Sequence, residues 1–477
     1  MTAQPPLLSR KAPPPKAGIV HLGLGAFFRA FGAAMVEEAM ATSGGNWGIC
    51  GVSLRSPEVR DRLAAQGNVY TAGELSTDGQ KTRIITSVSD VIFAPENPGA
   101  LLDRLADPAV KIASLTVTEK GYCHIPSTGE LDTRHPDIQH DIANPTPRSA
   151  VGFLVRALDA RRKAGHRPFS VLSCDNLPNN GLVVRNAVLG LAAEIDPALA
   201  RWIASEGRFP ATMVDRIVPA VTEDDITQLM HRTGYLDRAA VFHEPFRQWV
   251  IEDDFVDGAR LDFTHVPGVQ MVADVAPFEH MKVRMLNGTH SALAYLGYLA
   301  GHQTIAETVS DPVFRSYAQN LWKREIIPTL APPEGVDLNH YASELLGRYD
   351  NAAVRHRTWQ IAMDGSQKLP QRLLGTIADN TAAGRPCDGL ILAVAAWMRY
   401  VGGVDEQGDP IDVRDPLASQ LRSLSDSRDT PRGKVDALLT LDQIFGAAPA
   451  ERFRNTLAQS YESLVRLGAK QSCQNLQ

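Results

Sequence analysis

The chain changes character near residue 277, and this change constrains its fold more than any other feature of the sequence. Before that point, short β-rich runs alternate with helical patterns; from Glu279 onward, helical periodicity recurs and strand-like runs are nearly absent. Strands that alternate with helices are typical of right-handed crossovers and a mainly parallel sheet. The sequence therefore predicts an α/β domain over residues 18–277, followed by an all-helical domain over residues 278–477.

Individual elements are predicted from apolar periodicity and turn residues. In the first half we expect strands at 18–22, 47–54, 110–118 and 169–174, a hairpin of 69–75 with 82–88 across Asp78-Gly79, and helices at 28–40, 57–65 and 150–163. In the second half we expect helices at 281–299, 312–323, 342–348, 371–382, 390–400, 416–424 and 452–467. Residues 1–17 are rich in proline and lack the apolar core of a signal peptide, so they are predicted to be a flexible tail.

Composition excludes several classes of function. The 477 residues include 48 Lys or Arg and 54 Asp or Glu, which gives a net charge of −6. This balance is not basic enough for nucleic-acid binding by electrostatics alone. The longest apolar run, residues 389–398, is shorter than the roughly 20 residues that span a bilayer. We therefore expect neither a nucleic-acid nor a membrane partner.

The cysteines indicate the compartment and bear on metal binding. Five cysteines, odd in number and far apart, do not form the dense framework of a secreted disulfide scaffold. The nearest approach to a metal cluster is Cys123-His124 with His135 and His140, but this spacing fits no ligand template. The sequence predicts a cytoplasmic protein with reduced thiols and no metal site.

A glycine-rich turn joins the first predicted strand to the helix after it. The strand ends in the run Gly23-Leu24-Gly25-Ala26-Phe27-Phe28-Arg29. Gly23 can make the tight turn, and Gly25 lets the backbone approach a pyrophosphate. Ala26 and Phe27 lie between Gly25 and the helix, whose first amides are unpaired and carry partial positive charge, and Arg29 can add a charged hydrogen bond. This arrangement predicts a Rossmann-like dinucleotide-binding domain.

Two features leave that motif incomplete. Phe28 stands where the third glycine of the fingerprint belongs, so an ordinary strand-to-helix turn is an alternative interpretation. The second strand ends in Ser53-Leu54-Arg55-Ser56, without the acidic residue that binds the adenosine ribose hydroxyls of NAD. An arginine at this place can favour a ribose phosphate, so the motif leaves NAD and NADP open.

A lysine-containing segment of the helical half carries a second group of polar residues. On an α-helix of about 100° per residue, His290 lies about 80° and Asn287 about 140° round from Lys282. Lysine can take the proton of an alcohol during hydride transfer if desolvation lowers its pKa. Asn and His can donate to the alkoxide oxygen that develops. The alternative is a helix with ordinary surface polar residues.

Three further polar clusters interrupt apolar runs. Asn176 follows a buried strand, at the sheet edge where ligands bind, although it could also cap the next helix. Asp215 and Arg216 form an acid–base pair between apolar residues. They are either groups of a functional site or a structural salt bridge. Lys368 follows an Asp-Gly turn that begins at Asp364.

Together these segments resemble the polyol-specific long-chain dehydrogenase/reductase family, which includes mannitol 2-dehydrogenases and fructuronate reductases. The matching runs extend in family order from about residue 18 to 465: HLGLGAFFRA, SLTVTEKGY, SCDN, TMVDRIVPA, EPFRQWVIED, Lys-x4-Asn-x2-His and DGSQKLP. The resemblance implies a metal-independent NAD(H) oxidoreductase with a Rossmann-like domain and a helical C-terminal domain.

The resemblance also implies roles for the catalytic residues. Lys282 would be the general base in oxidation and the acid in reduction. Asn176 and Asn287 would stabilise the oxyanion, and His290 would orient the reacting oxygen. Glu279 would help to pass the proton to solvent.

Substrate residues point to one branch of the family. The resemblance implies that Asp215 and Lys368 hold the substrate chain. Mannitol dehydrogenases carry an arginine eight residues before that lysine, where this chain has Gln360. The run HRTWQIAMDGSQKLPQR instead resembles the fructuronate reductase branch, whose substrate bears a carboxylate. A planar guanidinium binds a carboxylate well. Arg357 and Arg372 are therefore candidate ligands, with Arg357 favoured, unless both pair with surface acids.

The expected activity is NAD-dependent reduction of D-fructuronate to D-mannonate by a monomer or small homo-oligomer. A mannitol or arabinitol 2-dehydrogenase is the nearest alternative, and a non-catalytic dinucleotide-binding sensor is an alternative of another class. The partner in each enzymatic case is a small sugar acid or polyol.

Overall fold

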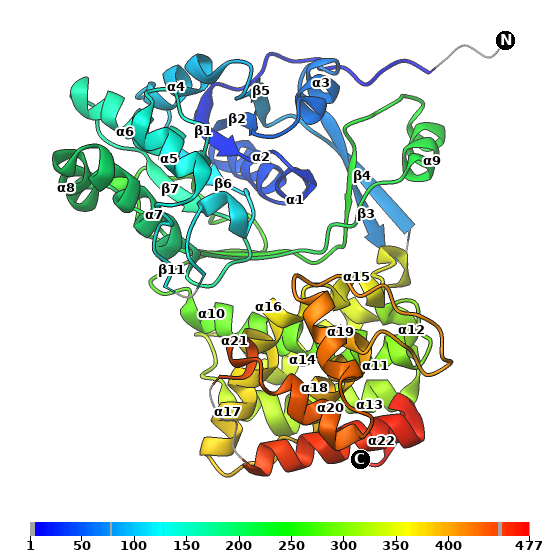
Figure 1. Ribbon diagram of the computed structural model, residues 1–477. Helices are drawn as coiled ribbons and strands as arrows, with labels where there is room; N and C mark the ends of the chain where they lie inside the picture. The colour runs from blue at the N-terminus through cyan, green and yellow to red at the C-terminus, as the bar shows by residue number, and fades with distance from the viewer. Residues whose placement is uncertain (1–4, 77–78, 127, 447–450, 477) are drawn as a thin grey trace. The chain divides into compact units, whose positions relative to one another are not determined.

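The computed structural model describes residues 5–76, 79–126, 128–446 and 451–476 (Figure 1). The chain forms two compact units, Met1–Ala276 and Pro277–Gln477. This division lies one residue from the boundary predicted between residues 277 and 278.

A five-stranded parallel sheet forms the centre of the first unit, with the strand order β5-β2-β1-β6-β7. The strands are β1 Ala17–Leu22, β2 Gly48–Ser53, β5 Val88–Phe93, β6 Ile112–Leu115 and β7 Ser170–Ser173. Strand order reverses between β1 and β6, which places the ligand crevice of such a sheet at their carboxyl ends. The predicted Rossmann-like sheet is confirmed.

Helices cover both faces of this sheet because its central strands are buried on both sides. Val20 and Leu22 face a core built with α4, α6, α7 and α8, whereas Ile19 faces a core built with α1 and α2. The helices of this unit are α1 Ala26–Ala30, α2 Gly32–Ser43, α3 Glu58–Ala64, α4 Pro98–Ala106, α5 Pro136–Ala143, α6 Ala150–Lys163, α7 Asn180–Ile195, α8 Pro197–Glu206 and α9 Glu223–Thr233, with 3₁₀ turns at Glu119–Tyr122 and Val256–Gly258.

Two small sheets complete the first unit. Strands β3 Tyr70–Ser76 and β4 Gly79–Ile85 pair antiparallel, which confirms the predicted hairpin, while residues 77–78 at its tip lie outside the described residues. Strand β9 Val241–His243 extends this hairpin. The other sheet consists of β8 Thr212–Asp215, β10 Gln248–Glu252 and β11 Val269–Val272. The sequence analysis did not predict the strands after β7.

The proline-rich start is bound to the first unit, so the predicted flexible tail is wrong for residues 5–16. The Arg10 guanidinium donates to the carbonyls of Gly67, Thr86 and Val88. The Leu8 amide donates to the Leu236 carbonyl at 2.9 Å. Proline supplies no backbone donor, so side-chain and isolated backbone hydrogen bonds fix this segment in place of a ladder.

The second unit is helical, as predicted. Its helices are α10 Ala276–Met281, α11 Thr289–Leu299, α12 Ile305–Ser310, α13 Pro312–Asn320, α14 Leu338–Tyr349, α15 Thr358–Ala362, α16 Gly365–Leu369, α17 Gly375–Ala382, α18 Asp388–Val401, α19 Ala418–Asp426, α20 Pro431–Leu438, α21 Asp442–Phe445 and α22 Glu451–Gln474, with 3₁₀ turns at Ile327–Thr329 and Ala352–Val354. Helix α18 is almost wholly buried and packs against α11 and α22. Within the described ranges, no helix combines the length and the hydropathy needed to cross a bilayer.

Three stretches in the described part of this unit are π-helical where α-helix was predicted or expected. They are Lys282–Gly288, Leu321–Ile326 and Pro370–Leu374. π-Helical turns are rare and are frequently found at functional sites. The first of them contains the lysine predicted to act as the base.

Glu325, in the second π-helix, holds the start of α18. Its carboxylate accepts the amides of Gly389 and Leu390, each at 2.9 Å. Burial raises the pKa of Glu325 from an ordinary 4.5 to about 7, although the two amides oppose this effect. The folded chain therefore binds a proton here more tightly than the unfolded chain does.

This raised pKa predicts a pH-dependent stability. The contribution of Glu325 is fully present below about pH 4.5 and is lost as the pH rises through about 7, an effect of about 3 kcal/mol. Glu325→Gln should remove this slope from the free energy of unfolding, measured by urea denaturation between pH 5 and about pH 8. Glu451→Gln, at an exposed acid of α22, is the control. Parallel profiles for wild type and Glu325→Gln would contradict the assignment.

Candidate active site

Gly23 is required by both the backbone and its packing. Its φ of +93° lies in the region that favours glycine. A Cβ atom at this position would lie 2.1 Å from the Thr116 carbonyl oxygen. The Gly23 amide donates to the Val52 carbonyl at 2.9 Å, so the turn is fixed between β2 and β6.

Neither the backbone conformation nor the packing of the protein requires glycine at position 25. Its φ is −76°, and a Cβ atom there would approach only the Gly23 carbonyl, at 3.8 Å. No side chain caps α1, which begins with Ala26 and Phe27 immediately after Gly25. Open space and uncapped amides at the carboxyl end of β1 fit a pyrophosphate. These features support the predicted coenzyme roles of Gly25, Ala26 and Phe27.

The missing third glycine is replaced by a different packing arrangement. The Phe28 ring stacks on His21, with ring centroids 3.3 Å apart and planes 7° from parallel. The Phe28 ring also requires glycine at position 32, four residues later, because a Cβ atom there would lie 2.3 Å from Cε2 of Phe28. The helix is interrupted at Phe31, where φ is −121°. The residues predicted as one helix over 28–40 therefore belong to two helices, α1 and α2.

His21 stabilises the glycine turn by side-chain hydrogen bonds, a role that was not predicted from the sequence. Its Nδ1 lies 2.8 Å from the Ser114 Oγ and its Nε2 lies 2.9 Å from the Thr116 Oγ1. Burial lowers the pKa of His21 to about 3, so the imidazole is neutral. A histidine inside an otherwise apolar strand was the available signal, because buried polar groups are hydrogen-bonded.

Arg29 has structural contacts in place of the predicted phosphate role. Its guanidinium is buried, donates to the Ala239 carbonyl and lies over the Tyr70 ring. Burial lowers the pKa of Arg29. These contacts tie α1 to β3 and to the segment before β9, and they do not agree with the predicted coenzyme role of Arg29.

Asp175 links the carboxyl ends of β6 and β7. Its carboxylate accepts the amides of Val117 and Thr118 at 2.9 and 3.0 Å and the Tyr122 hydroxyl at 2.7 Å. Burial raises the pKa of Asp175, and these three donors oppose the rise. The two motifs that contain these residues are thus joined at one sheet edge.

Asn176 follows Asp175 and is exposed at this edge. Helix α7 begins at Asn180 and its N-cap is Asn179, so the alternative role of Asn176 as the helix cap is wrong. Its place at the ligand-binding edge of a parallel sheet agrees with the predicted role in catalysis, which stays a prediction.

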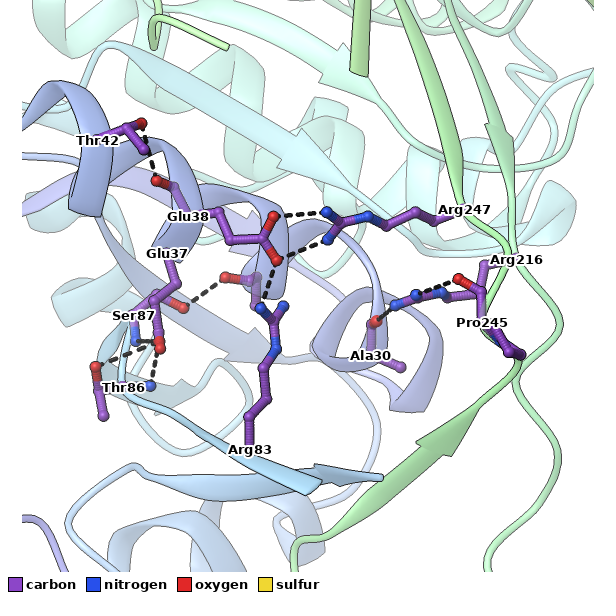
Figure 2. Close-up of polar contacts among 11 residues, drawn as sticks. Ala30, Glu37, Glu38, Thr42, Arg83, Thr86, Ser87, Arg216, Pro245 and Arg247 are labelled. Atoms are coloured by element: carbon purple, nitrogen blue, oxygen red, sulfur yellow. Dashed lines mark hydrogen bonds and ion pairs between the residues drawn. The ribbon is translucent and has the colours of Figure 1, made fainter. Parts of the chain in front are cut away.

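Arg216 does not form the salt bridge considered with Asp215. Its guanidinium donates to the carbonyls of Ala30 at 2.7 Å and Pro245 at 3.3 Å (Figure 2). It also donates to the Phe246 carbonyl at 3.0 Å. Burial lowers the pKa of Arg216 to about 10. Asp215 is buried at the carboxyl end of β8, and its substrate role stays a prediction.

A second arginine binds a carboxylate of α2. Arg247 binds Glu38 through two hydrogen bonds of 2.7 Å, and Arg83 binds the same carboxylate (Figure 2). Burial opposes ionisation of Glu38, but these hydrogen bonds outweigh it and lower the pKa. Two family-like motifs, which contain Arg216 and Arg247, therefore support the helices after the glycine turn.

In the second unit, Lys282 begins the π-helix Lys282–Gly288 and is buried. The predicted angles assumed an α-helix and are wrong here, because the i→i+5 hydrogen bonds of a π-helix make a wider turn. Fewer degrees per residue bring Asn287, five residues on, closer to the side of Lys282. Glu279 lies one turn earlier on α10 and is partly buried.

This π-helix packs against the π-helix Pro370–Leu374. A Cβ atom at Gly288 would lie 2.5 Å from the Arg372 carbonyl oxygen, so glycine allows the two backbones to approach. The approach brings Arg372 next to α11, where its guanidinium donates to the Ser291 Oγ at 3.0 Å.

His290 lies one residue before Ser291, in a buried group of rings. It stacks on Tyr349 with centroids 5.2 Å apart and meets the edge of His356 at 4.6 Å. Its Nε2 is buried and has no hydrogen-bond partner among the described residues. Burial lowers the pKa of His290 well below its usual range, and His356, Arg372, Arg348 and Lys368 lower it further. His290 is therefore neutral and surrounded by cations.

The structure brings Arg372 to this group but not Arg357. Arg372 is partly buried, and in the described part of the chain it forms one hydrogen bond, to Ser291, and no ion pair. Burial lowers the pKa of Arg372. Arg357 is exposed at the start of α15 and is not among the charges that act on His290. These positions favour Arg372 over Arg357 as the carboxylate ligand, and this role stays a prediction.

Lys368 and Arg348 complete the cationic group around His290. Burial lowers the pKa of Lys368 to about 8, and its Nζ donates to the Met363 carbonyl at 2.5 Å. Arg348 was not predicted from the sequence, because nothing in the chain order places the end of α14 beside α11. Among residues 5–76, 79–126, 128–446 and 451–476, no three His, Cys, Asp or Glu side chains form a group that could hold a metal.

Comparisons with known proteins identify the family. Residues 17–264 match the mannitol dehydrogenase Rossmann domain, and residues 274–465 match the mannitol dehydrogenase C-terminal domain. The chain belongs to the mannitol dehydrogenase family. It is an oxidoreductase that acts on CH–OH groups.

Individual relatives differ in their named substrates. The chain is 47% identical to D-mannonate oxidoreductase of Escherichia coli K12, over 95% of this chain and 94% of that protein. It is 40% identical to mannitol 2-dehydrogenase of Phaeosphaeria nodorum, over 95% of this chain and 80% of that protein. Pseudomonas fluorescens mannitol 2-dehydrogenase, solved as a ternary complex with NAD and D-mannitol, superposes with a TM-score of 0.87 at 40% identity, over 100% of this chain and 97% of that one.

The contrast between the two glycines of the turn is testable. Gly25→Val should leave the melting temperature within a few degrees of wild type, because its side chain meets open space. It should weaken NADH binding by at least about 10-fold, because the side chain fills the space beside the phosphate-binding amides. Gly23→Ala should instead destabilise the protein. Normal NADH affinity of the folded Gly25→Val variant, measured by fluorescence titration, would contradict the predicted coenzyme site.

Proposed function

We propose that the protein catalyses the NAD-dependent reduction of D-fructuronate to D-mannonate. The observation that carries this proposal is Arg372, a partly buried cation beside neutral His290 that forms no ion pair in the described part of the chain. A partly buried guanidinium without a carboxylate is suited to a carboxylate from the substrate. The likeness to D-mannonate oxidoreductase supports the same substrate.

The coenzyme, when bound, supplies the hydride. Lys282 donates the proton to the reacting oxygen in reduction and takes it back in oxidation. Asn287 and Asn176 donate hydrogen bonds to that oxygen as negative charge develops on it, and His290 orients it through its unpartnered Nε2. Glu279 passes the proton between Lys282 and solvent. No step requires a metal.

The rest of the substrate is held by residues outside this proton-transfer group. Asp215 accepts hydrogen bonds from substrate hydroxyls, and Lys368 donates to them when it leaves the Met363 carbonyl. The five cysteines are buried free thiols, in keeping with the expected cytoplasmic compartment.

A mannitol 2-dehydrogenase is the second candidate, because relatives with that name share about 40% of the sequence. Activity on hexuronate and on neutral sugars separates the two. The experiment follows NADH oxidation with D-fructuronate, D-tagaturonate and D-fructose in parallel. Turnover of fructose far above both keto acids would favour the polyol enzyme, and coenzyme binding without turnover of any of them would favour a sensor.

Lys282→Ala should lower kcat by at least about 100-fold, the lower end of the range for general acid–base catalysis. Coenzyme affinity should be nearly unchanged, because the glycine turn lies in the other unit. Lys323→Ala, at an exposed lysine of the same unit, is the control. Wild-type turnover in Lys282→Ala would disprove the assignment.

Arg372→Ala should cost roughly 2–5 kcal/mol in kcat/KM for D-fructuronate, the range for a buried charge pair that loses one partner. Activity on D-fructose should fall much less. Arg372→Lys should recover only part of the loss, because lysine lacks the planar fork. Arg357→Ala is the matched control and should keep wild-type discrimination. If Arg372→Ala keeps it too, the carboxylate binds elsewhere.

A further inference from the structure

A cavity in the first unit lies where a Rossmann-like fold binds the adenosine ribose. It has a volume of about 540 Å³, and Leu54 and Ala94, which line it, directly follow β2 and β5. The glycine turn is adjacent, because the amides of Gly23 and Leu24 both donate to the Val52 carbonyl near the end of β2. A dinucleotide whose pyrophosphate lies over Gly25 thus leads toward this cavity.

No carboxylate of the described residues lines the cavity. Its remaining lining residues are Pro95, Pro98, His140, Asn144, Pro145, Thr146, Pro147, Arg148 and Phe153. NAD-specific sites of this fold bind the ribose 2′-hydroxyl with an Asp or Glu at the end of the second strand. Glu58, the first acid after β2, is bound to Arg62. The acid that would select against a 2′-phosphate is therefore missing.

Two arginines supply positive charge at the same place. Arg148 lines the cavity, and Arg55 directly follows Leu54. Both side chains are exposed, and within the described ranges neither guanidinium has a hydrogen-bond or ion-pair partner. The backbone around Arg148 is nevertheless fixed, because its amide donates to the buried Asp141 carboxylate at 2.7 Å.

A neighbouring cavity of about 670 Å³ shows the opposite chemistry. Its lining includes the four acids Asp90, Glu96, Asp103 and Asp107. Its two arginines are bound to acids, Arg60 to Glu96 at 3.0 Å and Arg104 to Asp90 at 3.8 Å. A phosphate would be repelled there. Of these two cavities, the one that follows the glycine turn is lined by an arginine, Arg148, without an acid partner in the described residues, and Arg55 follows its lining residue Leu54.

We propose that this cavity receives an adenosine ribose with or without a 2′-phosphate, with Arg55 and Arg148 as the cations that bind the phosphate. The enzyme then accepts NADP(H) as well as NAD(H). This proposal rests on the dinucleotide site of the proposed function but not on the sugar substrate.

The test measures coenzyme binding without any sugar. NADH and NADPH are titrated by nicotinamide fluorescence into wild type, Arg55→Ala, Arg148→Ala, the double variant, and Arg104→Ala as an arginine of the neighbouring cavity. Wild type should bind the two coenzymes with affinities within about 10-fold of each other. Loss of both arginines should weaken NADPH at least about 10-fold, because a charge-assisted contact to phosphate is lost. NADH binding and the Arg104→Ala control should stay near wild type.

Several outcomes would overturn the proposal. If wild type binds NADH but not NADPH, the cavity does not accept the 2′-phosphate and the proposal is wrong. A double variant that weakens both coenzymes equally shows that the arginines do not read the phosphate. Wild type that binds neither coenzyme overturns the dinucleotide site as well. Failure to reduce D-fructuronate with either coenzyme, despite tight binding, contradicts only the proposed substrate.

Discussion

The approach of the Thr116 carbonyl to Gly23 sets the geometry of the coenzyme end of the protein. At 2.1 Å from a would-be Cβ atom, it leaves room for glycine alone. The same Thr116 side chain hydrogen-bonds His21, and Asp175 holds the two amides that follow Thr116. The carboxyl ends of β1, β6 and β7 are thus one connected structure, and a change at any of its members moves the turn that holds the pyrophosphate.

In the second unit, too, a glycine allows a close approach of two backbone segments. Gly288 admits the Arg372 carbonyl, as Gly23 admits that of Thr116. Here the close approach joins two π-helices, which carry Lys282 on one side and Arg372 on the other. A π-helix is unfavourable as a regular structure, so its presence at both contacts indicates that the packing around these residues is maintained at some cost.

The sequence predicted the features that follow from local pattern. The parallel sheet, the hairpin, the glycine turn and most long helices follow from periodicity and turn residues. Features that depend on contacts distant in sequence could not be predicted. The π-helical turn at Lys282 has the sequence pattern of an ordinary helix. Arg348 lies 58 residues from His290 along the chain. The sequence position of Arg29 suggests a phosphate ligand, whereas in the structure its guanidinium contacts Ala239 and Tyr70.

Two groups among the arginines of this chain bear on function. Arg10, Arg29, Arg161 and Arg216 donate to backbone carbonyls, so their guanidiniums stabilise segments that lack regular backbone partners. Arg55, Arg148 and Arg372 form no ion pair in the described residues, although Arg372 is partly buried. Keeping a partly buried cation without an anion is unfavourable unless a ligand supplies the charge. In the described residues, Arg372 lies without an anion at the proposed sugar-acid site, and Arg55 and Arg148 lie without anions near the proposed coenzyme site.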